Sequence, residues 1–211
     1  IKESFRESGQ TLWLGMRLVS LVVVRMRYRT LQRVAAVCGR ATRLAPDVRR
    51  VITANLRVAF PEWSEAEVAE VFHVVCRNIW LMGFETMWFA GRPDRVEAHV
   101  TTVTPTASRL LAQGRQGTPM LIITPHLGNW EVSAYYGVLH GLRLGAVVRR
   151  LEARAPERFT NKLRRRNGVE LIPGKGAVRG MVAALRAGKS IGILMDQGTK
   201  PNKGGVFAPF F

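Results

Sequence analysis

Short apolar runs alternate with helical segments from about residue 96 onward. The apolar runs span residues 120–124, 144–149, 169–173 and 190–196. Between them, helical periodicity covers residues near 130–140, 156–167 and 177–187. Strands that alternate with helices are typical of an α/β fold, so we predict a mixed, mainly parallel sheet flanked by helices.

The first third of the chain has the pattern of helices with a strongly basic flank. Residues 12–24 are apolar apart from Arg17, and six arginines follow within the next 19 residues: Arg25, Arg27, Arg29, Arg33, Arg40 and Arg43. The apolar stretch is shorter than the ~20 residues that a membrane span requires. We therefore expect residues 1–45 to form an amphipathic helical segment on a membrane surface, or to include the end of a span whose beginning is missing. The alternative is a core helix with a solvated basic face.

Two further helices are expected before the alternating region. Pro46-Asp47 opens a helix that continues to about Val58, and the Phe60-Pro61 dipeptide breaks it. Ser64 and Glu67 then have the spacing of a capping box, which starts a helix reaching to about Ala90. We assign residues 46–211 to one domain, and expect its C-terminal part to be missing because the chain stops within an apolar run.

The charge of the chain narrows the range of partners. Thirty-two Lys and Arg against 15 Asp and Glu give a formal net charge of +17. Such an excess favours an anionic partner, which includes nucleic acid, an acidic membrane surface and a phosphorylated ligand. Cys38 and Cys76 lie in apolar stretches without metal-ligand spacing, so we expect free thiols and no metal site.

His126 and Glu131 flank a turn directly after an apolar run, in the sequence Pro125-His-Leu-Gly-Asn-Trp-Glu131. A neutral imidazole can remove a proton from an attacking alcohol, and a carboxylate on its other ring nitrogen fixes the tautomer. Residues five apart on a continuous helix point about 140° apart, so cooperation requires the chain to turn between them, at Gly128-Asn129. No serine or cysteine lies beside His126 in the sequence, which favours direct transfer without a covalent acyl-enzyme.

Four polar residues fall at the carboxyl ends of the expected strands. They are His126, Arg149, Lys175 and Asp196. Functional groups of α/β proteins gather at that edge of the sheet. Lys175, beside free N–H groups at the start of a helix, is a candidate for holding a phosphate.

Two motif-like stretches are set aside. Residues 188–192 match G-x-S-x-G, but a helix precedes and a strand follows, the reverse of a nucleophile elbow. Residues 174–180 have their third glycine one position late for a dinucleotide-binding loop.

The His126-x4-Glu131 pair is similar to the H-x4-D/E motif of glycerolipid acyltransferases. The wider stretch 125–131 resembles the lipid A biosynthesis late acyltransferases, the lauroyl and myristoyl transferases. Segments 55–67, 167–173, Asp196-Gln197 and 204–211 resemble further blocks of that family, in order from about residue 46 to the end.

The resemblance implies transfer of a fatty acyl chain from acyl carrier protein, or from CoA, to a hydroxyl of a lipid A precursor. It also implies that the reaction takes place at the cytoplasmic face of the inner membrane and requires no cofactor. It implies that His126 is the base, that Glu131 is its partner, and that Arg149, Asp196 and Asn129 bind substrate. Arg150 stands where the family pattern has proline.

Other functions remain open from the sequence. The acceptor of the acyl chain is alternatively a phosphatidylinositol mannoside or a lysophospholipid. Arg164, Arg165 and Arg166 would suit phosphates in a nucleic-acid-binding protein, although no nucleic-acid motif supports that interpretation. In the enzyme these three arginines either dock the acidic carrier protein or form a solvated basic face. A membrane-associated remnant without activity is the third possibility.

Overall fold

A computed structural model describes residues 2–148 and 154–196 of the chain. Its elements, in order, are α1 (Lys2–Val23), α2 (Tyr28–Ala41), the 3-10 helix η1 (Thr42–Leu44), α3 (Pro46–Ala59), α4 (Glu65–Phe89), α5 (Pro93–His99), α6 (Pro105–Arg115), β1 (Leu121–Thr124), α7 (Trp130–Leu139), β2 (Leu144–Val148), α8 (Arg154–Arg166), β3 (Glu170–Pro173), α9 (Ala177–Arg186) and β4 (Ser190–Leu194). The strands begin and end within two residues of the expected apolar runs.

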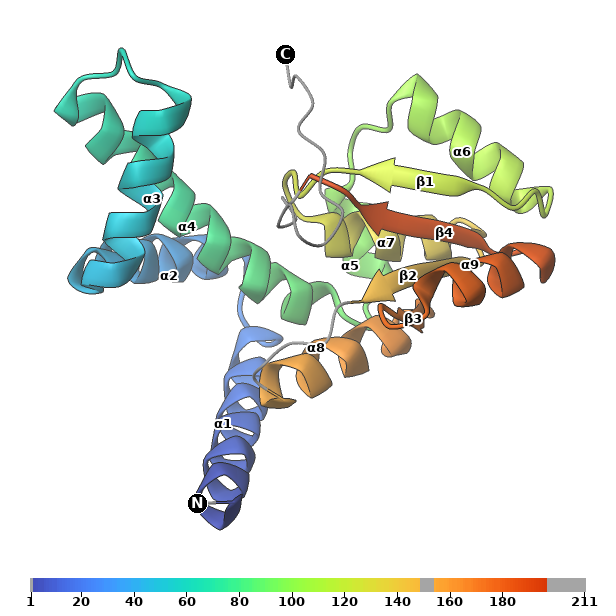
Figure 1. Cartoon of the computed structure of the whole chain (residues 1–211), viewed down its shortest axis with the longest axis horizontal. Coiled ribbons are helices and arrows are strands. Elements are labelled where there is room, and N and C mark those ends of the chain that lie inside the picture. Colours follow the sequence, from blue (N-terminus) through green and yellow to red (C-terminus); the bar gives the residue numbers. More distant parts are fainter. Residues whose placement is uncertain (1, 149–153, 197–211) are drawn as a thin grey trace.

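The four strands form one sheet with the order β1-β4-β2-β3. Each described strand pairing is parallel, which confirms the α/β architecture expected from the alternation of elements. β4, the last strand among the described residues, inserts between β1 and β2 (Figure 1). This insertion places the end of β4 next to the end of β1.

The helices α2, α3 and α4 form a separate helical region beside the sheet, and α4 runs from this region toward the sheet (Figure 1). α4 starts with the predicted capping box: the Ser64 side chain accepts a bond from the Glu67 N–H, and Glu67 reaches back to the Ser64 backbone. α2 packs closely along α4 at Gly39, where a Cβ atom would come within 2.7 Å of the Arg77 backbone nitrogen. Glycine is therefore needed at this crossing.

The largest core cluster joins the helical region to the sheet region. Leu31 of α2, Trp88 of α4, Tyr135 of α7 and Val169 before β3 all belong to it. The buried apolar side chains thus cross the expected division near residue 45.

α1 extends away from this core and lies against α8 (Figure 1). Trp13 and Met16 of α1 pack against Phe159 and Leu163 of α8. Val23 at the end of α1 is buried in the core. Six other apolar residues of α1 are exposed: Leu12, Leu14, Leu18, Val19, Leu21 and Val22. Across residues 2–148 and 154–196, no helix has the length and apolar character needed to cross a bilayer.

Candidate active site

His126 and Asp196 lie side by side because of the register between two neighbouring strands. Thr124, the last residue of β1, pairs with Leu194, the last residue of β4. His126 and Asp196 each follow two residues later, so a parallel pairing carries both side chains to the same place at the carboxyl edge of the sheet.

The Asp196 carboxylate holds both the ring and the backbone of His126. Its Oδ1 lies 2.6 Å from His126 Nδ1, and its Oδ2 accepts the His126 backbone N–H at 2.7 Å. These hydrogen bonds hold the pKa of Asp196 below its usual range, so the carboxylate is ionised at neutral pH. An ionised carboxylate only accepts hydrogen bonds, so Nδ1 carries the proton and the lone pair of the neutral ring is on Nε2.

The chain turns sharply between the histidine and α7. Gly128 has a φ of 61°, a left-handed conformation that favours glycine. Asn129 then caps α7, with its Oδ1 accepting the Val132 N–H at 3.2 Å. The Trp130 ring packs edge-on against the His126 ring at a centroid distance of 4.6 Å. The turn expected at Gly128-Asn129 is therefore present, and it brings the ring over the start of α7.

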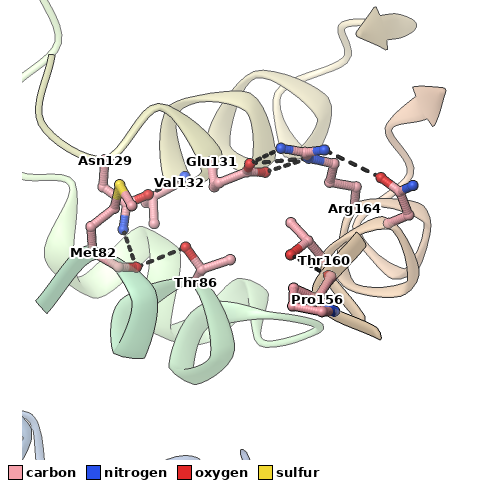
Figure 2. Close-up of polar contacts among 9 residues, drawn as sticks. Met82, Thr86, Asn129, Glu131, Val132, Pro156, Thr160 and Arg164 are labelled. Carbon is pink, nitrogen blue, oxygen red and sulfur yellow. Dashed lines mark hydrogen bonds and ion pairs between the residues drawn. The ribbon is translucent and has the colours of Figure 1, made fainter. Parts of the chain in front are cut away.

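Glu131 does not hold the Nδ1 bond that the sequence assigned to it, because Asp196 occupies that position. The Glu131 carboxylate is bound instead by Arg164 of α8 (Figure 2). Arg164 Nε lies 3.0 Å from each carboxylate oxygen, and Nη2 also donates to Oε1. Glu131 therefore joins α7 to α8.

The Glu131–Arg164 pair is largely buried. The side chains are 8% and 22% exposed, respectively. Glu131 also lies in the first turn of α7, where the helix dipole favours a negative charge. Arg164 Nη1 donates to Asn161 Oδ1 at 3.2 Å, which fixes the guanidinium further. Arg164 is thus bound within the protein, whereas Arg165 and Arg166 are exposed on α8.

The remaining predicted site residues have other positions. Both polar atoms of the Asn129 side chain bind within the protein, which favours a structural role over substrate contact. Lys175 is exposed after β3, and the sheet order separates β3 from β1 by three strand spacings, about 14 Å. Arg149 lies outside the described residues.

Two further observations concern the serine of the G-x-S-x-G match and the possibility of a metal site. Ser190, the serine of the G-x-S-x-G match, starts β4 at the amino end of the strand, opposite to Asp196. Among the described residues, no group of three His, Cys, Asp or Glu side chains is placed to hold a metal ion.

The geometry supports general-base chemistry at an exposed sheet edge. The His126 and Asp196 side chains are 24% and 28% exposed, so an alcohol can approach the ring. The sequence placed both His126 and Asp196 at the carboxyl ends of expected strands, and this would have identified Asp196 as the partner had the order β1-β4 been known. No sequence signal pointed to the pairing of Glu131 with Arg164, which lie 33 residues apart.

The family model described as bacterial lipid A biosynthesis acyltransferase matches residues 2–211. No curated protein matches the chain.

Proposed function

The chain belongs to the bacterial lipid A biosynthesis acyltransferase family, and we propose that it moves a fatty acyl chain from the thioester of acyl carrier protein to a hydroxyl of a lipid A precursor. The observation that carries this proposal is the hydrogen bond between His126 Nδ1 and Asp196 at the edge of the sheet. It prepares a neutral imidazole as a base for an alcohol, which is the group that O-acyl transfer must activate.

The reaction proceeds in two steps without a covalent acyl-enzyme. The acceptor O–H gives its proton to His126 Nε2 while its oxygen attacks the thioester carbonyl carbon. The resulting tetrahedral intermediate then breaks its C–S bond, and the imidazolium returns the proton to the departing thiolate. The products are an ester and a free thiol. Asp196 stabilises the imidazolium between the steps and keeps the ring in one tautomer.

The surface of the chain supports membrane association. Several apolar side chains of α1 are exposed, and exposed arginines follow at positions 25, 27 and 29. Apolar residues beside basic ones bind the surface of anionic bilayers. We propose that the protein lies at the cytoplasmic face of the inner membrane, where its lipid acceptor and a cytoplasmic acyl donor are both accessible.

The net charge of +17 supports an anionic donor and an anionic acceptor. Acyl carrier protein and acyl-CoA are both anionic, and both present the same thioester. A lipid A precursor, a phosphatidylinositol mannoside and a lysophospholipid likewise offer both hydroxyls and phosphate. These molecules are therefore the substrates to compare in one assay.

The test is expression of the full-length gene in a bacterial host that lacks its own late acyltransferases. Mass spectrometry of its lipid A should show one added acyl chain, and the His126→Ala variant should not add it. Purified protein should transfer acyl groups faster from acyl carrier protein than from CoA. Unchanged lipid A, together with acylation of a phosphatidylinositol mannoside or a lysophospholipid in vitro, would refute the assignment of the acceptor.

A covalent intermediate is tested separately. Intact mass spectrometry of the protein incubated with acyl donor alone should show no acyl adduct, whereas an adduct that disappears on addition of acceptor would refute direct transfer.

A further inference from the structure

Glu85 of α4 connects three parts of the fold through one carboxylate. The Tyr28 hydroxyl of α2 donates to Glu85 Oε1, and Asn129 Nδ2 donates to Glu85 Oε2 at 2.9 Å. Glu85 is half-buried, and nothing in the family match assigns it a role. The helical region thus reaches the turn that carries His126 through a defined hydrogen-bond chain.

Glu85 determines which way the Asn129 amide points. Both Glu85 oxygens accept hydrogen bonds, so Asn129 turns its NH2 group toward α4. Asn129 Nδ2 also lies 3.4 Å from the Met82 carbonyl oxygen of the same helix (Figure 2). The amide oxygen is then left to accept the Val132 N–H and cap α7. If the Asn129 amide were reversed, its NH2 group could not accept the Val132 N–H that caps α7. Its oxygen would then face the Glu85 carboxylate, which is also an acceptor.

Tyr28, whose hydroxyl donates to Glu85 Oε1, is also held in place. The Tyr28 ring packs against Trp88 at 5.3 Å and against His99 at 4.6 Å between centroids. Burial, and then the neighbouring Glu85 carboxylate, raise the pKa of Tyr28, so its hydroxyl stays protonated at neutral pH. Tyr28 is therefore a permanent donor to Glu85.

The Asn129 anchor lies close to the His126 ring along the chain and in space. Asn129 follows His126 by three residues, and the next residue, Trp130, packs on the His126 ring. On the sheet side, the His126 backbone N–H is bound by Asp196. The turn is thus fixed at one end by the sheet and at the other end by α4.

We propose that Glu85 is a positioning residue for His126, which acts through Asn129 and joins the packing of α2 and α4 to the catalytic turn. A displacement of α2 against α4 then moves the base. Misplacement of a reacting group by about 1 Å can lower a rate by about 10²-fold, so this contact controls turnover without touching substrate. The rate effects of this inference rest on the proposed acyl transfer, but its structural effect on the His126 ring does not.

An exchange of donor and acceptor tests the contact. Asn129→Asp keeps a good helix cap but places two carboxylates together, so kcat should fall about 10–100-fold with a smaller change in KM. In Glu85→Gln alone, the side-chain NH2 group replaces one of the two acceptor oxygens, so one of the hydrogen bonds from Tyr28 and Asn129 must rearrange. We expect kcat of this variant to fall only a few-fold. In the double variant the introduced glutamine donates to the introduced aspartate and accepts from Tyr28, so kcat should return to within about threefold of Glu85→Gln.

Ring NMR of His126 provides a readout that does not require substrate. Two-bond 1H–15N spectra should show the His126 signals shifted in Asn129→Asp and restored in the double variant, with the signals assigned by their loss in His126→Gln. Tyr28→Phe removes only the distal donor and should shift the same signals by less. Thr104→Ala is the matched control, because it removes the cap of α6, where Thr104 accepts the Ala107 N–H. It should lower the melting temperature and leave kcat and the ring signals unchanged.

Three results would overturn the inference. The first is Asn129→Asp protein that is folded and has wild-type kcat and ring signals. The second is an impaired Asn129→Asp that Glu85→Gln does not recover, which would mean that Asn129 acts without Glu85. The third is a His126 spectrum unaffected by Tyr28→Phe. Absence of acyl transfer by the wild type would refute the proposed function, while the ring signals would still decide the role of Glu85.

Discussion

Replacing Asp196 by Asn should damage the enzyme more than replacing it by Ala. The backbone N–H of His126 is a fixed donor that requires an oxygen from the side chain at position 196. The introduced asparagine must therefore turn its carbonyl oxygen toward the backbone, which directs its NH2 group at Nδ1 of the ring. Nδ1 then becomes an acceptor, and the ring proton moves to Nε2. Nε2 is the atom that must accept the proton of the alcohol in the proposed reaction.

The size of the effect follows from this reversal of the tautomer. With Nε2 protonated, His126 cannot take the proton of the acceptor alcohol, and the general-base contribution of about 10²–10⁴-fold is lost. Asp196→Ala lets the ring adopt either tautomer and lets the backbone N–H bind water, because the site is open to solvent. We therefore expect kcat to decrease in the order wild type, Asp196→Ala, Asp196→Asn. Because Asp196 is partly exposed, folding should change little.

The assay combines initial rates of acyl transfer with ring NMR of His126. The wild type should show a protonated Nδ1, and Asp196→Asn a protonated Nε2, at a pH where the ring is neutral. Thermal unfolding of all three proteins controls for stability. Turnover of Asp196→Asn equal to or above that of Asp196→Ala would refute the argument, as would an unchanged tautomer in a slow Asp196→Asn enzyme.

Three further predictions concern the base, the buried ion pair and α1. His126→Ala should lower kcat about 10²–10⁴-fold without changing the melting temperature, and near-normal turnover would rule out His126 as the base. Arg164→Met should lower the free energy of unfolding by about 3–5 kcal/mol in urea denaturation, because it leaves the Glu131 carboxylate buried and unpaired. Adding Glu131→Gln to Arg164→Met should recover much of this loss, and no recovery would contradict a charge effect. Leu18→Asp with Val22→Asp should weaken binding to anionic vesicles about tenfold or more in sedimentation assays at low salt, since both side chains are more than half exposed, and unchanged binding would exclude α1 as the membrane contact.

The local elements of this fold were readable from the sequence because each depends on neighbouring residues. Strands of a parallel sheet typically have continuous apolar sequences, so β1 and β4 were located within two residues at each end. The start of α4 was fixed by Ser64 and Glu67, whose reciprocal bonds involve only their own backbone. His126 was identified for the same reason, since a turn directly after a strand is a local pattern.

The partners of the functional side chains were decided only by the tertiary structure. Asp196 meets His126 because β4 inserts beside β1, and strand order is selected by the packing of the whole sheet. Glu131, five residues from the histidine, was the nearer carboxylate in the sequence, but burial of its charge required a cation, and α8 brings Arg164 to it across 33 residues. The sequence thus located His126 and the elements around it, whereas the carboxylate that binds its ring depended on strand order and on charge burial, neither of which is encoded in a local pattern.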